Sequence, residues 1–135
     1  MKKNIIGFGL LVFAAGSIVP MTIINRHYVA EKNGSTYGYW QSTAKNIDIW
    51  ANKEFRATWN AKLIIPSGYK FGIEGETISS ALGKNELMGT LTKEGKILVK
   101  ILNKLEKNHC IKWINSDLGG WIDPRSKNEG ILKHL

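Results

Sequence analysis

The chain has 135 residues, of which 43% are hydrophobic, with a formal net charge of +8 and a single cysteine. This length allows one modest hydrophobic core, and the lone Cys110 excludes an internal disulfide, so packing alone has to hold the fold. The excess of lysine and arginine favours polyanionic partners such as teichoic acids, anionic lipids or nucleic acid, through a long-range attraction that salt weakens.

The N-terminus carries the pattern of an export signal. Lys2 and Lys3 precede a run over residues 5–24 that is uncharged and mostly apolar, as a secretion machinery and a bilayer require. Small residues at 14–16 offer a cleavage site, whereas about 20 residues also suffice to span the hydrocarbon core as an uncleaved anchor. We expect residues 1–30 to be a signal peptide or membrane anchor, and the protein to be exported, at the cell surface or outside the cell. A buried helix of a soluble protein is the weaker alternative.

The remainder of the chain has the size of one domain. Without residues 1–30, which hold three basic residues and no acid, the net charge falls from +8 to +5. An exported chain without a disulfide is typical of a Gram-positive surface protein rather than of a secreted eukaryotic domain. We expect a linker over residues 31–42, a domain over residues 43–135, and membrane contact only through residues 1–30 if they stay attached.

Short apolar segments separated by turn residues predict strands in the first half of the domain. Residues 47–51 alternate between apolar and polar, with the period of two that a half-buried strand requires. The apolar residues 63–65 are stopped by the turn sequence Pro-Ser-Gly at 66–68. Residues 69–74 alternate most regularly and predict the best-defined strand.

The second half of the domain is predicted to continue as strands, with one ambiguous segment. Residues 87–91 form an apolar segment before a Lys-Glu-Gly turn that ends at Gly95. The run 96–105 has apolar residues at the spacing of one helical face, but alternate residues also fit a strand. We choose a strand, because turn residues precede this run and follow it at 107–108, before the apolar segment 110–114.

The C-terminal part has an apolar and aromatic segment at 111–114, a polar loop at 115–119 and the sequence Gly-Trp-Ile-Asp at 120–123. This pattern resembles the end of the GW modules, the bacterial Src-homology-3-like cell-wall-binding domains of Gram-positive surface proteins. Trp113 matches the strand aromatic of the family, and Gly120 with Trp121 matches its signature pair. The resemblance covers about the last 40 residues, and the upstream half is poorly matched.

This resemblance implies the fold and the function. It implies an all-β domain, a small Src-homology-3-like barrel, preceded here by the N-terminal apolar signal or anchor helix. Such modules hold proteins to the cell wall without a covalent bond, often through teichoic acids. The section 55–91 is longer than the family pattern, and its role is left open.

We therefore expect a non-catalytic exported protein that binds the Gram-positive cell envelope, through an anionic wall polymer such as teichoic acid. Lysines would meet the phosphates and aromatic side chains would contact the sugars. The plain alternatives are a solvated lysine face and, for Trp121 above all, an aromatic side chain in the core. A small protein-binding module, acting as inhibitor or accessory subunit, is the alternative function. The candidate ligand-binding residues are Trp50, Lys100, Lys104, Lys112, Trp113 and Trp121.

The sequence offers little support for catalysis or for a cofactor. His109 and Cys110 are adjacent and would point to opposite faces of a strand, so they are not expected to pair as base and nucleophile. The three histidines lack metal-ligand spacing, and the chain has no glycine-rich phosphate loop. No enzyme activity, cofactor, metal or nucleic-acid partner is expected.

Overall fold

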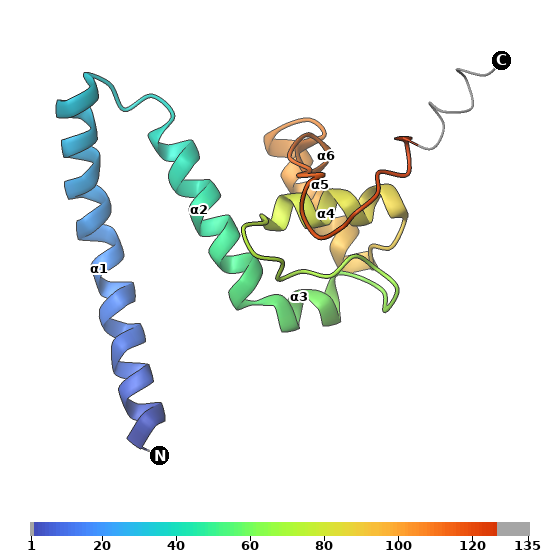
Figure 1. The fold of residues 1–135 in the computed structure, drawn as a ribbon, viewed down its shortest axis with the longest axis horizontal. Helices are drawn as coiled ribbons and strands as arrows, with labels where there is room; N and C mark the ends of the chain where they lie inside the picture. Colours follow the sequence, from blue (N-terminus) through green and yellow to red (C-terminus); the bar gives the residue numbers. More distant parts are fainter. Residues whose placement is uncertain (1, 127–135) are drawn as a thin grey trace. The chain divides into compact units, whose positions relative to one another are not determined.

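The computed structural model describes residues 2–126 of the chain. Two compact units follow one another, with the boundary between Thr43 and Ala44. The elements within the described residues are helices (Figure 1). They are α1 (Lys2–Asn33), α2 (Tyr39–Glu54), α3 (Arg56–Lys62), α4 (Ile78–Met88), α5 (Lys93–Leu105) and α6 (His109–Lys112).

The first unit contains α1, a single helix of 32 residues. Its segment Lys3–Asn33 is long and apolar enough to cross a membrane, and its apolar side chains are exposed. Pro20 lies inside the helix, as is tolerated in membrane-type helices. The expected signal or anchor segment therefore exists as a helix that can cross a bilayer. It runs past residue 30, so that the connection to α2 is only residues 34–38.

The expected all-β Src-homology-3-like barrel is wrong. Within residues 2–126, extended pairing is limited to one isolated bridge, Ile64 with Leu91. Residues 47–51 belong to α2, residues 96–105 belong to α5, and residues 69–74 are irregular. Of the other segments predicted as strands, 63–65 and 87–91 contribute only that single bridge, and 110–114 and 120–123 are helical or irregular.

Two threonine caps explain where α4 and α5 begin. The Thr77 side chain accepts a hydrogen bond from Ser80 N–H at the start of α4, and Thr92 accepts one from Gly95 N–H at the start of α5. Such caps satisfy backbone donors that a helix leaves unpaired at its N-terminus. At the other end of α4, Gly89 has φ of 68°, the left-handed conformation that often ends a helix.

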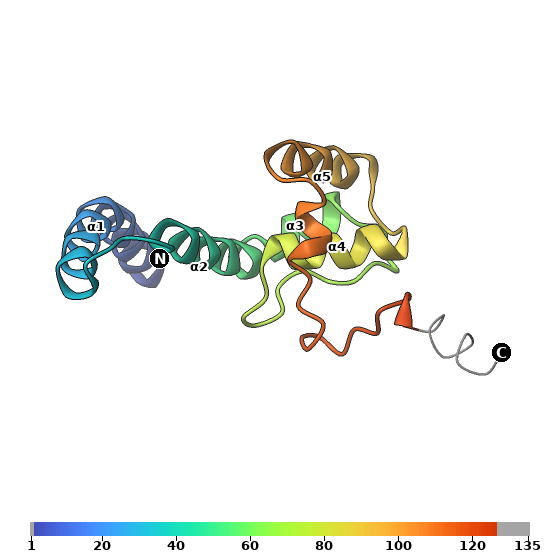
Figure 2. The ribbon, with the colours of Figure 1, turned by 90° about the horizontal axis from the view of Figure 1, so that it is seen from above.

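The core of the second unit forms around α4. Ala81 and Leu82 of α4 are completely buried, and Cys110 of α6 packs against them. α5 packs on the same centre (Figure 2). The section 55–91 thus supplies much of the core instead of an inserted loop. The remaining buried core residues are Leu63, Ile64, Phe71, Leu91 and Val99.

Candidate functional site

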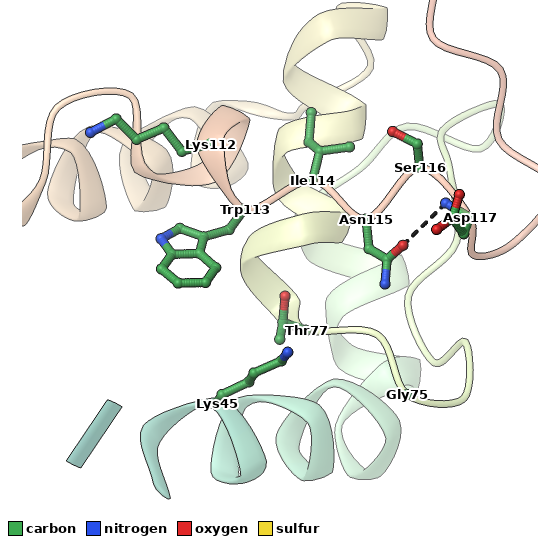
Figure 3. Close-up of a pocket in the computed structure, with 9 residues that line it drawn as sticks. All are labelled: Lys45, Gly75, Thr77, Lys112, Trp113, Ile114, Asn115, Ser116 and Asp117. Atoms are coloured by element: carbon green, nitrogen blue, oxygen red, sulfur yellow. Dashed lines mark hydrogen bonds between the residues drawn. The ribbon is translucent and has the colours of Figure 1, made fainter. Parts of the chain in front are cut away.

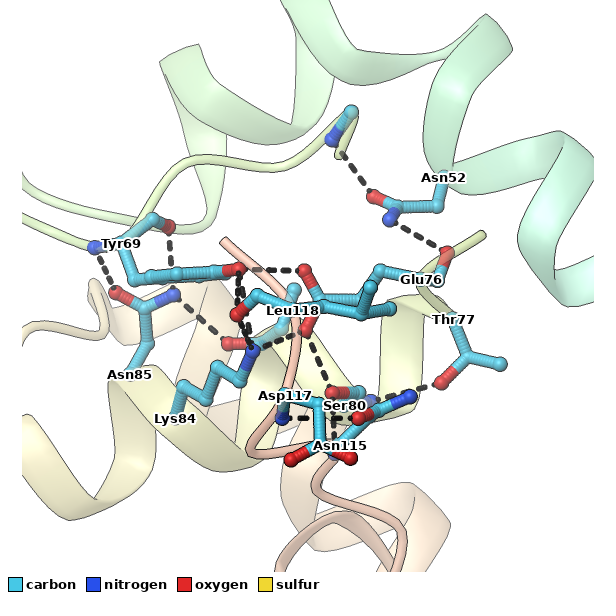
Figure 4. Close-up of polar contacts among 12 residues, drawn as sticks. Asn52, Tyr69, Glu76, Thr77, Ser80, Lys84, Asn85, Asn115, Asp117 and Leu118 are labelled. Atoms are coloured by element: carbon cyan, nitrogen blue, oxygen red, sulfur yellow. Dashed lines mark hydrogen bonds and ion pairs between the residues drawn. The ribbon is translucent and has the colours of Figure 1, made fainter. Parts of the chain in front are cut away.

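A buried ion pair stands at the centre of the domain (Figure 4). The side chains of Glu76 and Lys84 are both 0% exposed, and Lys84 Nζ lies 2.6 Å from Glu76 Oε1. Tyr69 and Ser80 each donate a hydroxyl hydrogen bond of 2.7 Å to the carboxylate, and Lys84 also donates to the Leu118 carbonyl at 2.9 Å. Each charge is therefore met by several partners, as burial requires. The pair joins α4 to the segments before and after it.

Aromatic rings close this pair from water. Lys84 Nζ lies 4.4 Å from the centroid of the Tyr69 ring and 5.6 Å from that of Trp121, within the range of a cation–π contact. Burial and the Glu76 carboxylate raise the pKa of Tyr69 above its usual value, so the phenol stays protonated and donates. The network holds the fold together and has no access for a ligand.

An open pocket of about 480 Å³ lies on the surface between α2, the start of α4 and the segment after α6 (Figure 3). Lys45 supplies an ammonium group, Trp113 an indole, and Thr77 and Asn115 polar side chains. We call these four residues the anion pocket. Figure 3 shows the Lys45 side chain pointing toward Thr77, with the Trp113 indole ring to one side of both. Asp117 also lines the hollow and lowers its positive charge.

A carboxylate clasp holds Trp113 in place. Glu106 accepts hydrogen bonds from His109 Nδ1 at 2.8 Å, Lys112 Nζ at 3.1 Å and Trp113 Nε1 at 3.2 Å. The Lys112 amine is thus directed to Glu106 and away from Lys45 (Figure 3). The hydrogen bonds from His109, then from Trp113 and Lys112, lower the pKa of Glu106 to about 2.

This clasp has a testable pH dependence. The folded-state pKa of Glu106 is about 2, below the usual 4.5. The clasp therefore contributes fully to the stability of the folded state above pH 4.5, and this contribution is lost as the pH falls toward 2. In an NMR titration, we expect the Glu106 carboxyl and the Trp113 indole N–H signals to move together with a midpoint near pH 2. Glu106→Gln should remove that step from the indole titration. A carboxyl midpoint near 4.5 would show that the clasp is not formed.

Three side chains are arranged in the order of a serine–histidine–acid triad. The Ser79 hydroxyl lies 3.2 Å from His109 Nε2, and His109 Nδ1 lies 2.8 Å from Glu106. These distances match those of hydrolytic triads. Hydrolysis also needs an accessible nucleophile and donors for an oxyanion, so the surroundings of Ser79 decide what this arrangement can do.

The surroundings of Ser79 do not provide these features. Ser79 is 7% exposed and does not line the anion pocket. The nearby backbone donors are already occupied, since Ile78 N–H binds Asp48 Oδ1 and Ser80 N–H binds Thr77 Oγ1. The hydrogen-bonded chain therefore fastens α6 to the first turn of α4.

Cys110 is similarly unsuited to act as a nucleophile. It lies in α6 instead of a strand, and its side chain is completely buried. Burial, with the nearby Glu86 and Asp48 carboxylates, raises the pKa of the thiol to about 12, so the reactive thiolate is scarce at neutral pH. Among residues 2–126, no cluster of three or more His, Cys, Asp or Glu side chains is placed to hold a metal ion.

The structure brings together only two of the residues predicted as ligand contacts. Lys112 and Trp113 line the same pocket, although the Lys112 amine is bound to Glu106. Lys100 and Lys104 are exposed on α5, and Lys100 lines a separate cavity of about 300 Å³ beside α4. Trp50 is exposed on α2 and stacks edge-on with a neighbouring ring. Trp121 is buried over Lys84, in agreement with the core alternative.

The sequence interpretation missed the other pocket residues. Lys45 lies between the predicted linker and the predicted strand 47–51, and nothing in its sequence neighbourhood indicates a pocket. Thr77 had a usable signal, because threonine is one of the residues preferred at the N-cap of a helix. Recognising it would have required reading the polar stretch 75–84 as a helix.

Comparison of the chain with protein-family models, with curated proteins and with solved structures finds no match. The resemblance of residues 111–123 to the GW modules therefore rests on those residues alone. The barrel that it implies is contradicted by the helical fold. Any functional proposal therefore rests on the geometry of the pocket and of the helix surfaces.

Proposed function

We propose that the chain is a non-catalytic envelope protein, exported or anchored through α1, that binds an anionic wall polymer such as teichoic acid in the anion pocket. The observation that supports this is the placement of Lys45, Thr77 and Trp113 around one hollow. These residues come from three separate parts of the chain. An ammonium, a hydroxyl and an indole together suit a phosphate joined to a sugar.

Each part of the pocket has a distinct role in this proposal. The Lys45 ammonium attracts a phosphate, and the Trp113 indole offers an apolar face to a sugar ring. The Thr77 hydroxyl and the Asn115 amide supply directional hydrogen bonds. The volume of about 480 Å³ falls within the usual range for small-molecule sites, about 300 to 1,000 Å³. A sugar phosphate unit therefore fits the pocket in size.

The local charge predicts moderate, salt-sensitive binding. Lys45 is exposed, and Asp117 stands in the same pocket. Exposed charges contribute little individually and are screened within about 10 Å at ordinary ionic strength. The net charge of +8 adds a long-range attraction to a polyanion. Binding should strengthen with polymer length, because a longer polyanion meets several copies or several charges at once.

The test is co-sedimentation of full-length protein, kept in mild detergent, with purified Gram-positive cell walls before and after removal of teichoic acids. We expect binding to native walls that falls with salt and with stripping. Trp113→Ala should weaken it about tenfold, as for a central aromatic contact, and Lys45→Gln by up to about fivefold, as for an exposed charge. Trp50→Ala is the matched control, an exposed indole outside the pocket.

Two outcomes would contradict the proposal. Equal loss for Trp50→Ala and Trp113→Ala would show that the pocket is not the binding site. Failure to bind every wall preparation would exclude a wall polymer. The alternative function, a protein-binding module, would then be tested. Its binding to a protein partner is expected to be less sensitive to salt.

A further inference from the structure

The outer face of α5 is apolar although it is exposed. The helix buries Gly95 and Val99 against the core. On the opposite side it leaves Ile97 48%, Ile101 52% and Leu105 82% exposed. These three residues are spaced by four and therefore form one line along the helix. Large aliphatic side chains grouped in this way mark a surface that meets another apolar phase.

Lysines follow one edge of this line. At about 100° per residue, Lys100 and Lys104 lie within about 60° of Ile97, on the same side. Lys96 lies farther round that side, and all three are exposed. The one acid of α5, Glu94 in its first turn, lies about 60° from Ile97 on the side away from Lys100 and Lys104. We call Ile97, Ile101 and Leu105, with Lys96, Lys100 and Lys104, the α5 stripe.

We propose that the α5 stripe lies on the surface of a membrane that contains anionic lipids. An apolar line bordered by lysines is the pattern of helices that lie in the bilayer interface. The aliphatic side chains enter the boundary of the acyl chains, and the lysine chains extend so that their ammonium groups reach the phosphates. This role is additional to the anion pocket and does not depend on it.

Charge complementarity favours lipid over the other occupants. A second copy of the chain would bring the four lysines of α5 against a single acid of that helix, Glu94. A protein partner would need an apolar groove with an acidic border on one side. An anionic leaflet supplies both an apolar phase and negative charge. α1 is long and apolar enough to hold the domain near such a leaflet. The sequence interpretation limited membrane contact to residues 1–30 and assigned Lys100 and Lys104 to a wall polymer.

The experiment uses full-length protein reconstituted through α1 into two kinds of vesicle, one of phosphatidylcholine and one with about 30% phosphatidylglycerol, an anionic lipid. Leu105→Cys carries an environment-sensitive dye, and the native Cys110 is buried and does not compete for the label. The dye reports burial by a blue shift and by quenching from brominated lipids. We expect both signals in anionic vesicles and their loss at high salt.

Paired variants separate the proposed contact from general effects of charge and hydrophobicity. At low salt, Lys100→Gln with Lys104→Gln should weaken membrane association of α5 about 30-fold, since each lysine near an anionic surface contributes about fivefold. Lys53→Gln with Lys70→Gln removes equal charge away from α5 and should change it little. Ile101→Glu should abolish the signals, whereas Ile122→Glu alters an exposed isoleucine elsewhere and should keep them.

The proposal is overturned by any of three results. Equal dye burial in neutral and anionic vesicles would exclude recognition of the lipid charge. Dye burial in lipid-free detergent that grows with protein concentration would identify a second copy as the occupant. Equal effects of the two lysine pairs would show that only net charge matters. Lys45→Gln should leave the dye signals unchanged, so failure of the anion pocket can be told apart.

Discussion

Replacing Lys84 with methionine is expected to destabilise the domain by about 3 to 5 kcal/mol, the range for breaking a buried ion pair by removing one partner. The methionine fills most of the space but leaves the Glu76 carboxylate uncompensated at a site that is 0% exposed. It also removes the hydrogen bond that ties the Leu118 carbonyl to α4. The free energy of unfolding of full-length protein, measured with denaturant in mild detergent by near-ultraviolet circular dichroism, tests this.

A double-mutant cycle separates the pair from the packing around it. Glu76→Gln keeps one acceptor oxygen, which can replace the acceptor of either Tyr69 or Ser80, and it leaves the Lys84 ammonium without its counter-charge. Combining it with Lys84→Met removes both charges, so the double variant should be less destabilised than the sum of the single variants.

An exposed ion pair provides the matched control for that cycle. Lys53→Met breaks a pair with Glu74 in which both side chains are more than half exposed. It should change stability by less than about 1 kcal/mol. Equal effects for Lys84→Met and Lys53→Met would contradict the burial of the central pair.

Gly83→Ala is expected to push α6 away from α4 and to destabilise the domain by about 3 kcal/mol, the upper range for overpacking. A Cβ at position 83 would stand 2.3 Å from the Cys110 carbonyl oxygen and 2.7 Å from its carbonyl carbon. Both obstacles are backbone atoms, so no side-chain rotation relieves them. The two helices therefore need a glycine here for close approach.

The reactivity of Cys110 gives a direct readout of this contact. In the native protein the thiol is buried and should react slowly with a maleimide, whereas Gly83→Ala should expose it and speed the reaction. Gly89→Ala is the control, because its added Cβ meets nothing within 4 Å and only the φ of 68° is strained. It should lower stability by about 1 kcal/mol without raising thiol reactivity. Native thiol reactivity in Gly83→Ala would mean that α4 and α6 do not touch as described.

The same contact links the core to the anion pocket. Trp113 directly follows α6, and Asn115 N–H donates to Ser80 Oγ at 2.9 Å, so α4 holds both pocket residues in place. Ser80 in turn donates to Glu76. Loss of the buried pair should therefore loosen the pocket as well as lower stability.

The error over residues 96–105 shows how local signals misled the sequence interpretation. The spacing of apolar residues in this run indicated a helix, which the structure confirms as α5. The prediction of a strand depends on Gly95 being part of a hairpin turn. In the fold, Gly95 lies in the first turn of α5, where a Cβ would stand 2.3 Å from the Leu63 carbonyl oxygen. A glycine that permits close packing and one that permits a turn look the same in a sequence.

The alternation over residues 69–74 misled for a related reason. A period of two requires a neighbouring strand to complete its hydrogen bonds, and here the backbone is served by side chains instead. Asn60 accepts from Phe71 N–H and Asn52 from Gly72 N–H. Asparagines far away along the chain cannot be recognised as such partners before the fold is known.

Three properties could be predicted from the sequence alone: the membrane-length apolar helix, the basic charge and the absence of an internal disulfide. These depend on composition and on neighbouring residues, and tertiary contacts do not change them. The helical domain, the buried Glu76–Lys84 pair and the pocket between Lys45 and Trp113 depend on segments that meet only when the core forms. Tertiary packing decided between local patterns that suit either a helix or a strand, because only the assembled core determines which side chains are buried and where the backbone groups find hydrogen-bond partners.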